Sequence, residues 1–230
     1  IFKILEKIAK YDGIDYVSKV TTNDQYDFIS KPSNESMKGF TIVVDDYGVK
    51  RNILRILESR GCRVVVVPAK SSAQEVLSLK PDGIVISPGP GDPELLKYLV
   101  NKTKKLIGNL PILGICLGNQ VLGCAMGGKT FKLPFGHRGG NHPVKDLVSG
   151  KVSITAQNHG YALDAETLPS CLDVTHINLN DGTVEGIRHS ELPIMGIQFH
   201  SEASPGPLDN EYLFDRFLKL VKNKKIECIV

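Results

Sequence analysis

Short aliphatic runs alternate with segments of helical spacing over the first half of this chain. Four runs are typical of buried strands, at residues 41–45, 64–68, 83–89 and 111–115. Apolar residues at helical spacing, ending near a glycine or proline, mark the segments between them: residues 50–60, 72–79, 93–108 and 117–126. This alternation predicts an α/β fold with an open, mostly parallel sheet flanked by helices.

The pattern changes after Gly128. Shorter, partly alternating runs follow, separated by turn dipeptides such as Asp181-Gly182. They predict a smaller mixed or antiparallel β layer beside the main sheet. Residues 210–223 carry an apolar stripe at helical spacing, which predicts a last helix packed against the sheet.

The first 38 residues differ from the rest. Residues 1–10 have apolar side chains at helical spacing, and a polar stretch then extends to Glu35. We interpret residues 1–38 as a linker or the remnant of a preceding domain. Residues 39–230 then form a single α/β domain.

The composition excludes several classes of protein. Of the 230 residues, 41% are hydrophobic and 23% charged, with a formal net charge of +3, as in ordinary globular proteins. No run of five Lys or Arg indicates a nucleic-acid partner, and no apolar stretch approaches the ~20 residues of a membrane helix. The five cysteines form no CxxC pair, which favours a reducing, cytoplasmic compartment over a disulfide framework or zinc site.

The strongest local signal for chemistry is Gly114-Ile115-Cys116-Leu117-Gly118, between a predicted strand and a predicted helix. Flanking glycines permit the tight turn of a nucleophile elbow, which lifts Cys116 to the carboxyl edge of the sheet. The helix dipole favours a thiolate at this position. A buried structural cysteine at a crowded turn would give the same local sequence, so Cys116 needs a partner to decide the question.

A second element supplies that partner. The strand-like run Gly196–Glu202 ends in a histidine two residues before a glutamate. Period-two alternation places His200 and Glu202 on the same side of an extended segment. His200 could take the proton of Cys116 while Glu202 orients the ring, so the sequence predicts a Cys-His-Glu triad.

A Gly/Pro-rich loop at residues 87–93 lies between a predicted strand and a predicted helix. Such a loop frees backbone N–H groups, one of which could complete an oxyanion hole with the N–H of Leu117. A phosphate-binding loop is the alternative. The segment lacks both the Lys-Ser/Thr ending of a P-loop and the GxGxxG spacing.

These motifs together resemble the class-I glutamine amidotransferases, and in particular the glutaminase part of carbamoyl-phosphate synthetase small subunits. The resemblance extends almost continuously over residues 40–220, and it implies the flavodoxin-like architecture of that family. It rests on six segments: KRNIL at 50–54, SPGPGDP at 87–93, GICLGNQ at 114–120, FGHRGGNHPVKD at 135–146, TAQNHGYALD at 155–164 and HSEASPGP at 200–207.

The resemblance implies a role for each matched residue. Cys116 is the nucleophile, His200 the base and Glu202 its orienting group, while Gly89 and Leu117 donate to the oxyanion. The residues implied in binding glutamine are Gly89, Gly91, Leu117, Gln120, Asn158, Gly160 and Tyr161. For Tyr161, a role as a packing ring is the alternative.

The resemblance also implies a reaction and a partner. L-Glutamine would be hydrolysed to glutamate and ammonia through a cysteine thioester, and a large synthetase subunit would use the ammonia to make carbamoyl phosphate for pyrimidine or arginine biosynthesis. ATP and metal are expected only on that partner, so this chain is expected to hold no cofactor and no metal. Two alternatives are a stand-alone cysteine amidase or peptidase and a catalytically silent regulatory scaffold.

Three features depart from the family pattern or have no role. Asn119 stands where the family usually has histidine. The family's small subunit has a further N-terminal domain that contributes a serine to the glutamine pocket, and residues 1–35 correspond only to its trailing linker. Arg138, His142 and His159 have no derived role; for the histidines we favour hydrogen bonding over metal binding, since no carboxylate or cysteine is at ligand spacing.

Overall fold

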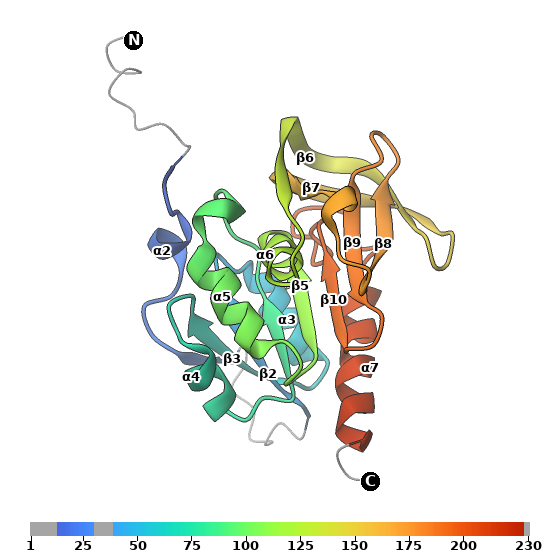
Figure 1. Cartoon of the computed structure of the whole chain (residues 1–230). Helices are drawn as coiled ribbons and strands as arrows, with labels where there is room; N and C mark the ends of the chain where they lie inside the picture. Colours follow the sequence, from blue (N-terminus) through green and yellow to red (C-terminus); the bar gives the residue numbers. More distant parts are fainter. Residues whose placement is uncertain (1–12, 30–38, 228–230) are drawn as a thin grey trace.

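A computed structural model describes residues 13–29 and 39–227, which form one ten-stranded sheet with helices on both faces (Figure 1). The strand order is β1-β3-β2-β4-β5-β10-β9-β8-β6-β7. In chain order the strands are β1 (Tyr26–Phe28), β2 (Thr41–Asp46), β3 (Arg63–Pro68), β4 (Gly83–Ile86), β5 (Ile112–Ile115), β6 (Thr130–Asp146), β7 (Val152–Leu163), β8 (Leu172–Asn178), β9 (Val184–His189) and β10 (Ile194–Ile197).

The parallel half of the sheet consists of β3, β2, β4, β5 and β10, which neighbour one another in that order. Taken in chain order, these five strands have the 2-1-3-4-5 arrangement of a flavodoxin-like sheet. All four aliphatic runs in the first half of the chain form strands here. The predicted fold class is therefore confirmed.

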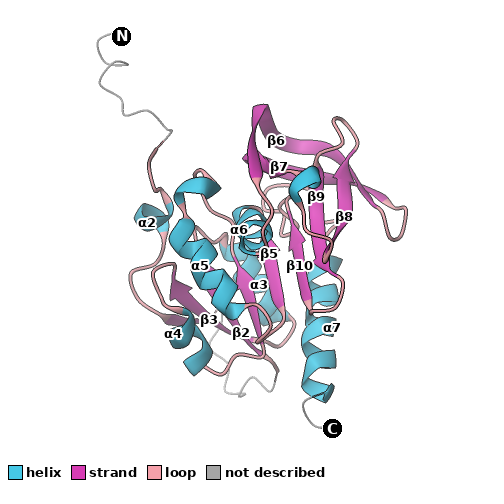
Figure 2. Ribbon diagram, viewed as in Figure 1, coloured by secondary structure: helices cyan, strands magenta, loops and turns pink. Residues whose placement is uncertain are grey.

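The other half is antiparallel. β9 pairs with β10, and β8, β6 and β7 follow outward. The antiparallel strands predicted after Gly128 thus continue the main sheet instead of forming a second layer. β6 and β7 make a long, irregular ribbon that rises above the rest of the sheet (Figure 2).

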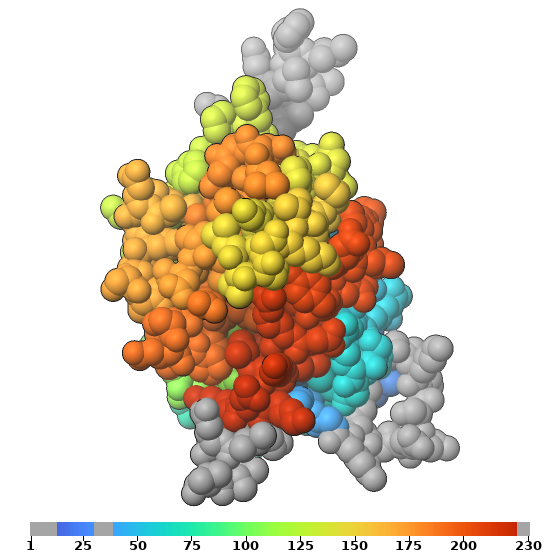
Figure 3. All heavy atoms as spheres, turned by 90° about the vertical axis from the view of Figure 1, so that its right-hand side faces the viewer, coloured from blue at the N-terminus to red at the C-terminus, as the bar shows by residue number. Residues whose placement is uncertain are grey.

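Helices cover both faces of the parallel strands because alternate side chains of each strand are buried on opposite sides. The helices are α2 (Val17–Val20), α3 (Arg51–Ser59), α4 (Ala73–Ser78), α5 (Lys97–Leu106), α6 (Leu117–Ala125) and α7 (Tyr212–Glu227). In β2, Ile42 and Val44 face one core together with α3 and α7, whereas Val43 faces the other with α4, α5 and α6. Figure 3 shows the C-terminal segment (red) on the molecular surface below the hairpin of β6 and β7 (yellow).

The helix predicted over residues 93–108 is divided. A single 3-10 turn, η1 (Pro93–Leu95), is followed at Leu96 by a residue outside helical geometry, and α5 then begins at Lys97. Asp92 caps the short turn by accepting from the Glu94 N–H at 2.9 Å. Asp92 and Pro93 fix where this turn begins, because both residue types favour the start of a helix.

Part of the N-terminal segment packs on the domain. β1 pairs antiparallel with β3, and Val17 and Phe28 are buried in the two cores. The helical pattern at residues 1–10 lies outside the described residues, and the boundary at residue 38 stays a prediction. None of the helices in the described ranges has the length and apolar character that a membrane crossing requires.

Candidate active site

Cys116 stands at the turn between β5 and α6, where the sequence predicts a nucleophile elbow. It is the N-cap residue of α6, with φ 53° and ψ −106°. Its N–H donates to the carbonyl of Ile197 on β10 at 2.8 Å, so two parallel strands fix the turn. A positive φ in a residue with a side chain is strained, and such strain concentrates at functional sites.

The glycines on both sides of Cys116 are required by close backbone approach. A Cβ on Gly118 would lie 2.1 Å from the carbonyl oxygen of Ile86 on β4. A Cβ on Gly114 would lie 2.6 Å from the oxygen of Gly118. The elbow is thus packed against β4, and only glycine fits these two positions.

His200 interacts with Cys116 on one side and with Glu202 on the other ring nitrogen. His200 Nδ1 is 2.6 Å from Glu202 Oε1, and Glu202 is fully buried. The His200 N–H donates to the Ala156 carbonyl at 2.9 Å, which joins this segment to β7. Because Nδ1 meets Glu202, the other ring nitrogen, Nε2, is the one available to the thiol.

The neighbours of His200 and Glu202 determine the pKa values of these two groups. Burial alone lowers the pKa of His200, but hydrogen bonds and charge from Cys116 and Glu202 outweigh burial and raise this pKa to about 10. Burial raises the pKa of Glu202, yet His200 and Lys50 hold it below its usual value. At neutral pH the ring therefore carries a proton that it can give to a leaving group.

Two residues at the start of α3 bind Glu202 and the residue that follows it. Lys50 Nζ lies 3.1 Å from Glu202 Oε1 and also donates to the Ala203 carbonyl. Asn52 Nδ2 donates to the Glu202 carbonyl at 2.6 Å. In the sequence both residues are only part of the KRNIL segment, and their role could not be predicted because about 150 residues separate them from Glu202.

Gly89 lies close to the elbow. A Cβ there would be 2.3 Å from the Tyr47 carbonyl oxygen and 2.8 Å from Leu117 Cδ2. This packing brings the loop at residues 87–93 against the start of α6, so the backbone of Gly89 and that of Leu117 border the same space. Their use as oxyanion donors stays a prediction.

A cavity of about 640 Å³ opens beside Cys116. Glu202 lies behind His200 and does not line it. All the other predicted site residues do: Gly89, Gly91, Cys116, Leu117, Gln120, Asn158, Gly160, Tyr161 and His200. The structure thus brings together residues from four separate parts of the chain, although their roles in binding stay predictions.

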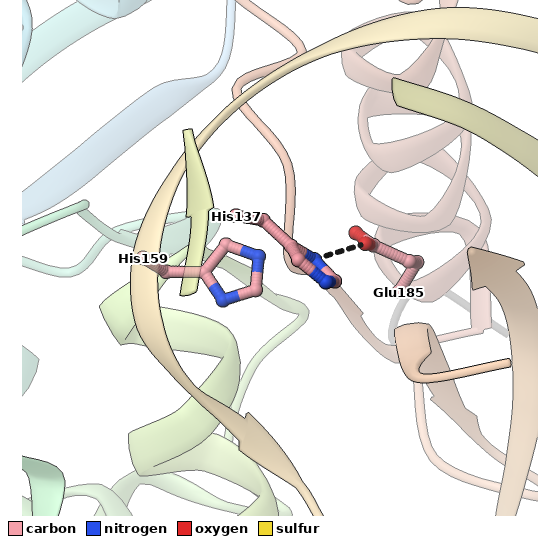
Figure 4. A group of neighbouring side chains, drawn as sticks. All are labelled: His137, His159 and Glu185. Atoms are coloured by element: carbon pink, nitrogen blue, oxygen red, sulfur yellow. Dashed lines mark ion pairs between the residues drawn. The ribbon is translucent and has the colours of Figure 1, made fainter. Parts of the chain in front are cut away.

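One cluster among the described residues has the donor atoms of a metal site. Nitrogens of His137 and His159 and a carboxylate oxygen of Glu185 lie within 4.8 Å of one another, on β6, β7 and β9 (Figure 4). The sequence did not reveal Glu185 as a neighbour of these histidines.

His137, His159 and Glu185 have hydrogen-bond partners within the protein. His137 Nε2 is 2.8 Å from Asp181 Oδ2, and His159 Nδ1 is 2.7 Å from the Tyr161 carbonyl oxygen. Glu185 accepts from the side-chain amides of Gln157 and Asn178. This pattern supports the hydrogen-bonding role expected for His159, and the absence of a metal stays a prediction.

The two remaining residues without a derived role lie on β6. Arg138 lines the cavity, and its guanidinium donates to the Phe135 carbonyl at 2.5 Å. His142 Nε2 is 3.4 Å from the Arg138 carbonyl oxygen, and the His142 ring lies against that of His137. These contacts shape the ribbon next to the cavity.

Comparison with known proteins agrees with this geometry. The family model for class-I glutamine amidotransferases matches residues 42–220. A chloroplastic carbamoyl phosphate synthase small chain of Oryza sativa is 47% identical, over 96% of this chain and 51% of the relative. The carbamoyl phosphate synthase small chain of Clostridium perfringens is 49% identical, over 94% of this chain and 59% of the relative. The chain thus spans little more than half the length of these curated relatives.

A solved structure shares the fold. The crystal structure of a candidate GMP synthase component from Thermoplasma acidophilum has a TM-score of 0.75 and 23% sequence identity, covering 84% of this chain and 98% of the other. At this identity the likeness concerns the fold alone.

Proposed function

The chain belongs to the class-I glutamine amidotransferases, and from this premise we propose that it is the glutaminase part of a carbamoyl-phosphate synthase small chain. It hydrolyses L-glutamine to glutamate and ammonia and passes the ammonia to a synthetase subunit. The identity of 47% and 49% to small chains from a plant and a bacterium supports this choice within the family.

The observation that carries the proposal is the placement of Cys116 at a strained elbow beside His200, which is itself bound to Glu202. A thiol nucleophile, a base and a group that orients the base are the parts required for acyl transfer. They meet at a cavity large enough for an amino acid.

In the first half of the reaction, the Cys116 thiolate attacks the side-chain amide carbon of glutamine. The C=O electron pair moves to oxygen, and the N–H groups of Gly89 and Leu117 stabilise the resulting oxyanion. When the oxyanion collapses, the C–N bond breaks and His200 gives its proton to the leaving nitrogen. Ammonia departs and a γ-glutamyl thioester remains on Cys116.

In the second half, His200 Nε2 takes a proton from water as the water oxygen attacks the thioester carbon. A second oxyanion forms in the same place. Its collapse breaks the C–S bond, releases glutamate and returns the Cys116 thiolate beside a protonated His200. Glu202 keeps the ring oriented through both halves.

Released ammonia is protonated in water and then no longer nucleophilic, so a coupled enzyme must deliver it to a second site. We assign that site, with its ATP and metal, to a large synthetase subunit, and we assign no cofactor to this chain. A cytoplasmic location is part of the proposal, and the free thiols of Cys62, Cys116, Cys124 and Cys171 are consistent with it.

The proposal is tested by glutamate release from the wild-type protein and from Cys116→Ser, alone and with a carbamoyl-phosphate synthetase large subunit. We expect Cys116-dependent release that rises when the partner and its substrates are added. A rate of glutamate release that does not change when the partner is added would indicate a stand-alone amidase. No release in either setting would indicate a silent scaffold.

A further inference from the structure

The carboxamide of Gln120 is held by two acceptors. Gln120 lies on α6, is 3% exposed, and contributes to the cavity wall. Its Nε2 donates to the Tyr161 carbonyl at 2.6 Å and to Gln198 Oε1 at 3.0 Å. An amide nitrogen has two protons, so both are directed at protein acceptors. The Oε1 atom of Gln120 is then the polar atom of this side chain left to meet a ligand.

Gln198 follows β10 and is fully buried. Its backbone N–H donates to the Glu185 carbonyl at 2.9 Å, which ties it to β9. Its Oε1 also lies 3.4 Å from Asn119 Nδ2, so both contacts with neighbouring amides are made through this oxygen. Tyr161 fixes which end of Gln120 is nitrogen, and the opposite orientation of Gln198 would place two NH₂ groups face to face.

This arrangement has a cost for Gln198 itself. Its Nε2 is buried with no hydrogen-bond partner among the described residues, as is Oδ1 of the neighbouring Asn119. Burying a polar group without a partner is unfavourable, and an exception in a folded protein calls for an explanation. A role in holding Gln120 supplies one, because Gln198 presents its oxygen to Gln120 at the expense of its own amide nitrogen.

We propose that Gln198 is a positioning residue that orients the Gln120 carboxamide so that Oε1 of Gln120 accepts a hydrogen bond from the α-ammonium group of bound glutamine. The inference rests on the proposed function. An amide oxygen attracts a cationic donor, whereas the rotated amide would present an NH₂ group and repel it. Gln198 thus makes the site selective for amides that carry an α-ammonium group.

The kinetic test uses Gln198→Met, which removes the acceptor at similar volume, and Gln198→Glu, which keeps an oxygen at the same place. Each is assayed in the full protein with its synthetase partner, on glutamine and on glutaramate, the analogue without the α-amino group. We expect Gln198→Met to raise KM for glutamine about 10- to 100-fold, as for the loss of a charge-assisted hydrogen bond. Its kcat and its KM for glutaramate should stay within about threefold of wild type, and Gln198→Glu should restore most of the affinity for glutamine.

Two results would overturn the proposal. An unchanged KM for glutamine in Gln198→Met would mean that Gln198 does not act through Gln120. An equal loss for glutamine and glutaramate would mean that Gln198 only supports the fold, since a general disturbance does not distinguish the two substrates.

A measurement without substrate separates this inference from the proposed function. In isotope-labelled protein, the side-chain NH₂ signal of Gln120 is identified by its absence in Gln120→Glu. We expect slow exchange of its protons with solvent in the wild type and faster exchange in Gln198→Met. Equal exchange in the two proteins would contradict the positioning role, whatever the kinetics; a wild type inactive on glutamine would instead contradict the proposed function.

Discussion

His200 Nδ1 meets Glu202 Oε1 at 2.6 Å, and this contact decides which ring nitrogen serves the chemistry. With Nδ1 fixed on a buried carboxylate, Nε2 is the ring nitrogen that the proposed mechanism uses to exchange a proton with Cys116, with the leaving ammonia and with water. Although burial lowers the pKa of His200, Cys116 and then this contact with Glu202 outweigh it and keep the proton on the ring at neutral pH. Glu202 therefore orients His200 and contributes to its charge.

The pH dependence of hydrolysis tests this contribution. Because the pKa of His200 is raised to about 10, the proton for the leaving ammonia is present at neutral pH and is lost as the pH rises through that value. Glu202→Gln removes the charge that favours the protonated ring, so the alkaline decline of kcat/KM should begin at a lower pH. A profile in Glu202→Gln that matches the wild type would show that Glu202 does not set the pKa of His200.

Asn52 provides a test of how the triad is held. Asn52→Ala removes the donor to the Glu202 carbonyl, and leaving that acceptor without a partner should cost about 1–3 kcal/mol, measured by denaturant unfolding. Asn52→Asp has the same shape but places a carboxylate against the carbonyl, so its kcat/KM should be lower than that of Asn52→Ala. Wild-type activity in Asn52→Asp would be incompatible with the contact.

Gly89→Ala tests the position of the predicted oxyanion donor. The added Cβ would lie 2.3 Å from the Tyr47 carbonyl oxygen, so the loop must move away from the elbow. Loss of an oxyanion donor typically lowers kcat by about 10²- to 10³-fold. Gly140→Ala is the control, since the nearest atom to its Cβ would be Pro207 Cδ at 3.9 Å. Steady-state kinetics would refute the assignment if Gly89→Ala kept its kcat.

A buried ion pair between β2 and α5 gives a prediction about stability. Lys102 Nζ lies 2.6 Å from Asp45 Oδ2, and both residues are shielded from solvent. Lys102→Met leaves the Asp45 carboxylate without a cation, which should lower the free energy of unfolding by about 3–5 kcal/mol.

The double variant Asp45→Val/Lys102→Met replaces the pair with apolar groups. Its stability should lie between that of Lys102→Met and that of the wild type, because the cost of burying two charges disappears while the buried Tyr47 hydroxyl and the Ala69 carbonyl each lose a hydrogen-bond partner. Denaturant unfolding of the double variant and of both single variants forms a double-mutant cycle. A double variant as unstable as the sum of the single ones would contradict this account of the pair.

The sequence was sufficient to predict the parallel sheet and the neighbouring positions of Cys116, His200 and Glu202, because both depend on local patterns. Continuous aliphatic runs mark strands buried on both faces, and the glycines around Cys116 mark a turn with no room for side chains. The contact between His200 and Glu202 could be predicted for the same reason, since residues two apart on an extended segment point to the same side.

Contacts between distant segments could not be predicted in this way. Nothing near Lys50 or Asn52 indicates that α3 holds the carbonyl and carboxylate of Glu202. Likewise, Gln198 is one polar residue in a strand-like run, and only the structure shows that it contacts Gln120. Val17 and Phe28, in the segment interpreted as a linker or the remnant of a preceding domain, become core residues only through the tertiary packing of that segment.

The most direct test of the central claim compares two nitrogen sources in the complex of this protein with a carbamoyl-phosphate synthetase large subunit. Cys116→Ser should abolish carbamoyl phosphate formation from glutamine while formation from added ammonia continues at the wild-type rate, because only the first route needs the thioester. Glutamine-dependent formation that survives in Cys116→Ser would contradict the assignment of Cys116 as the nucleophile and with it the proposed function.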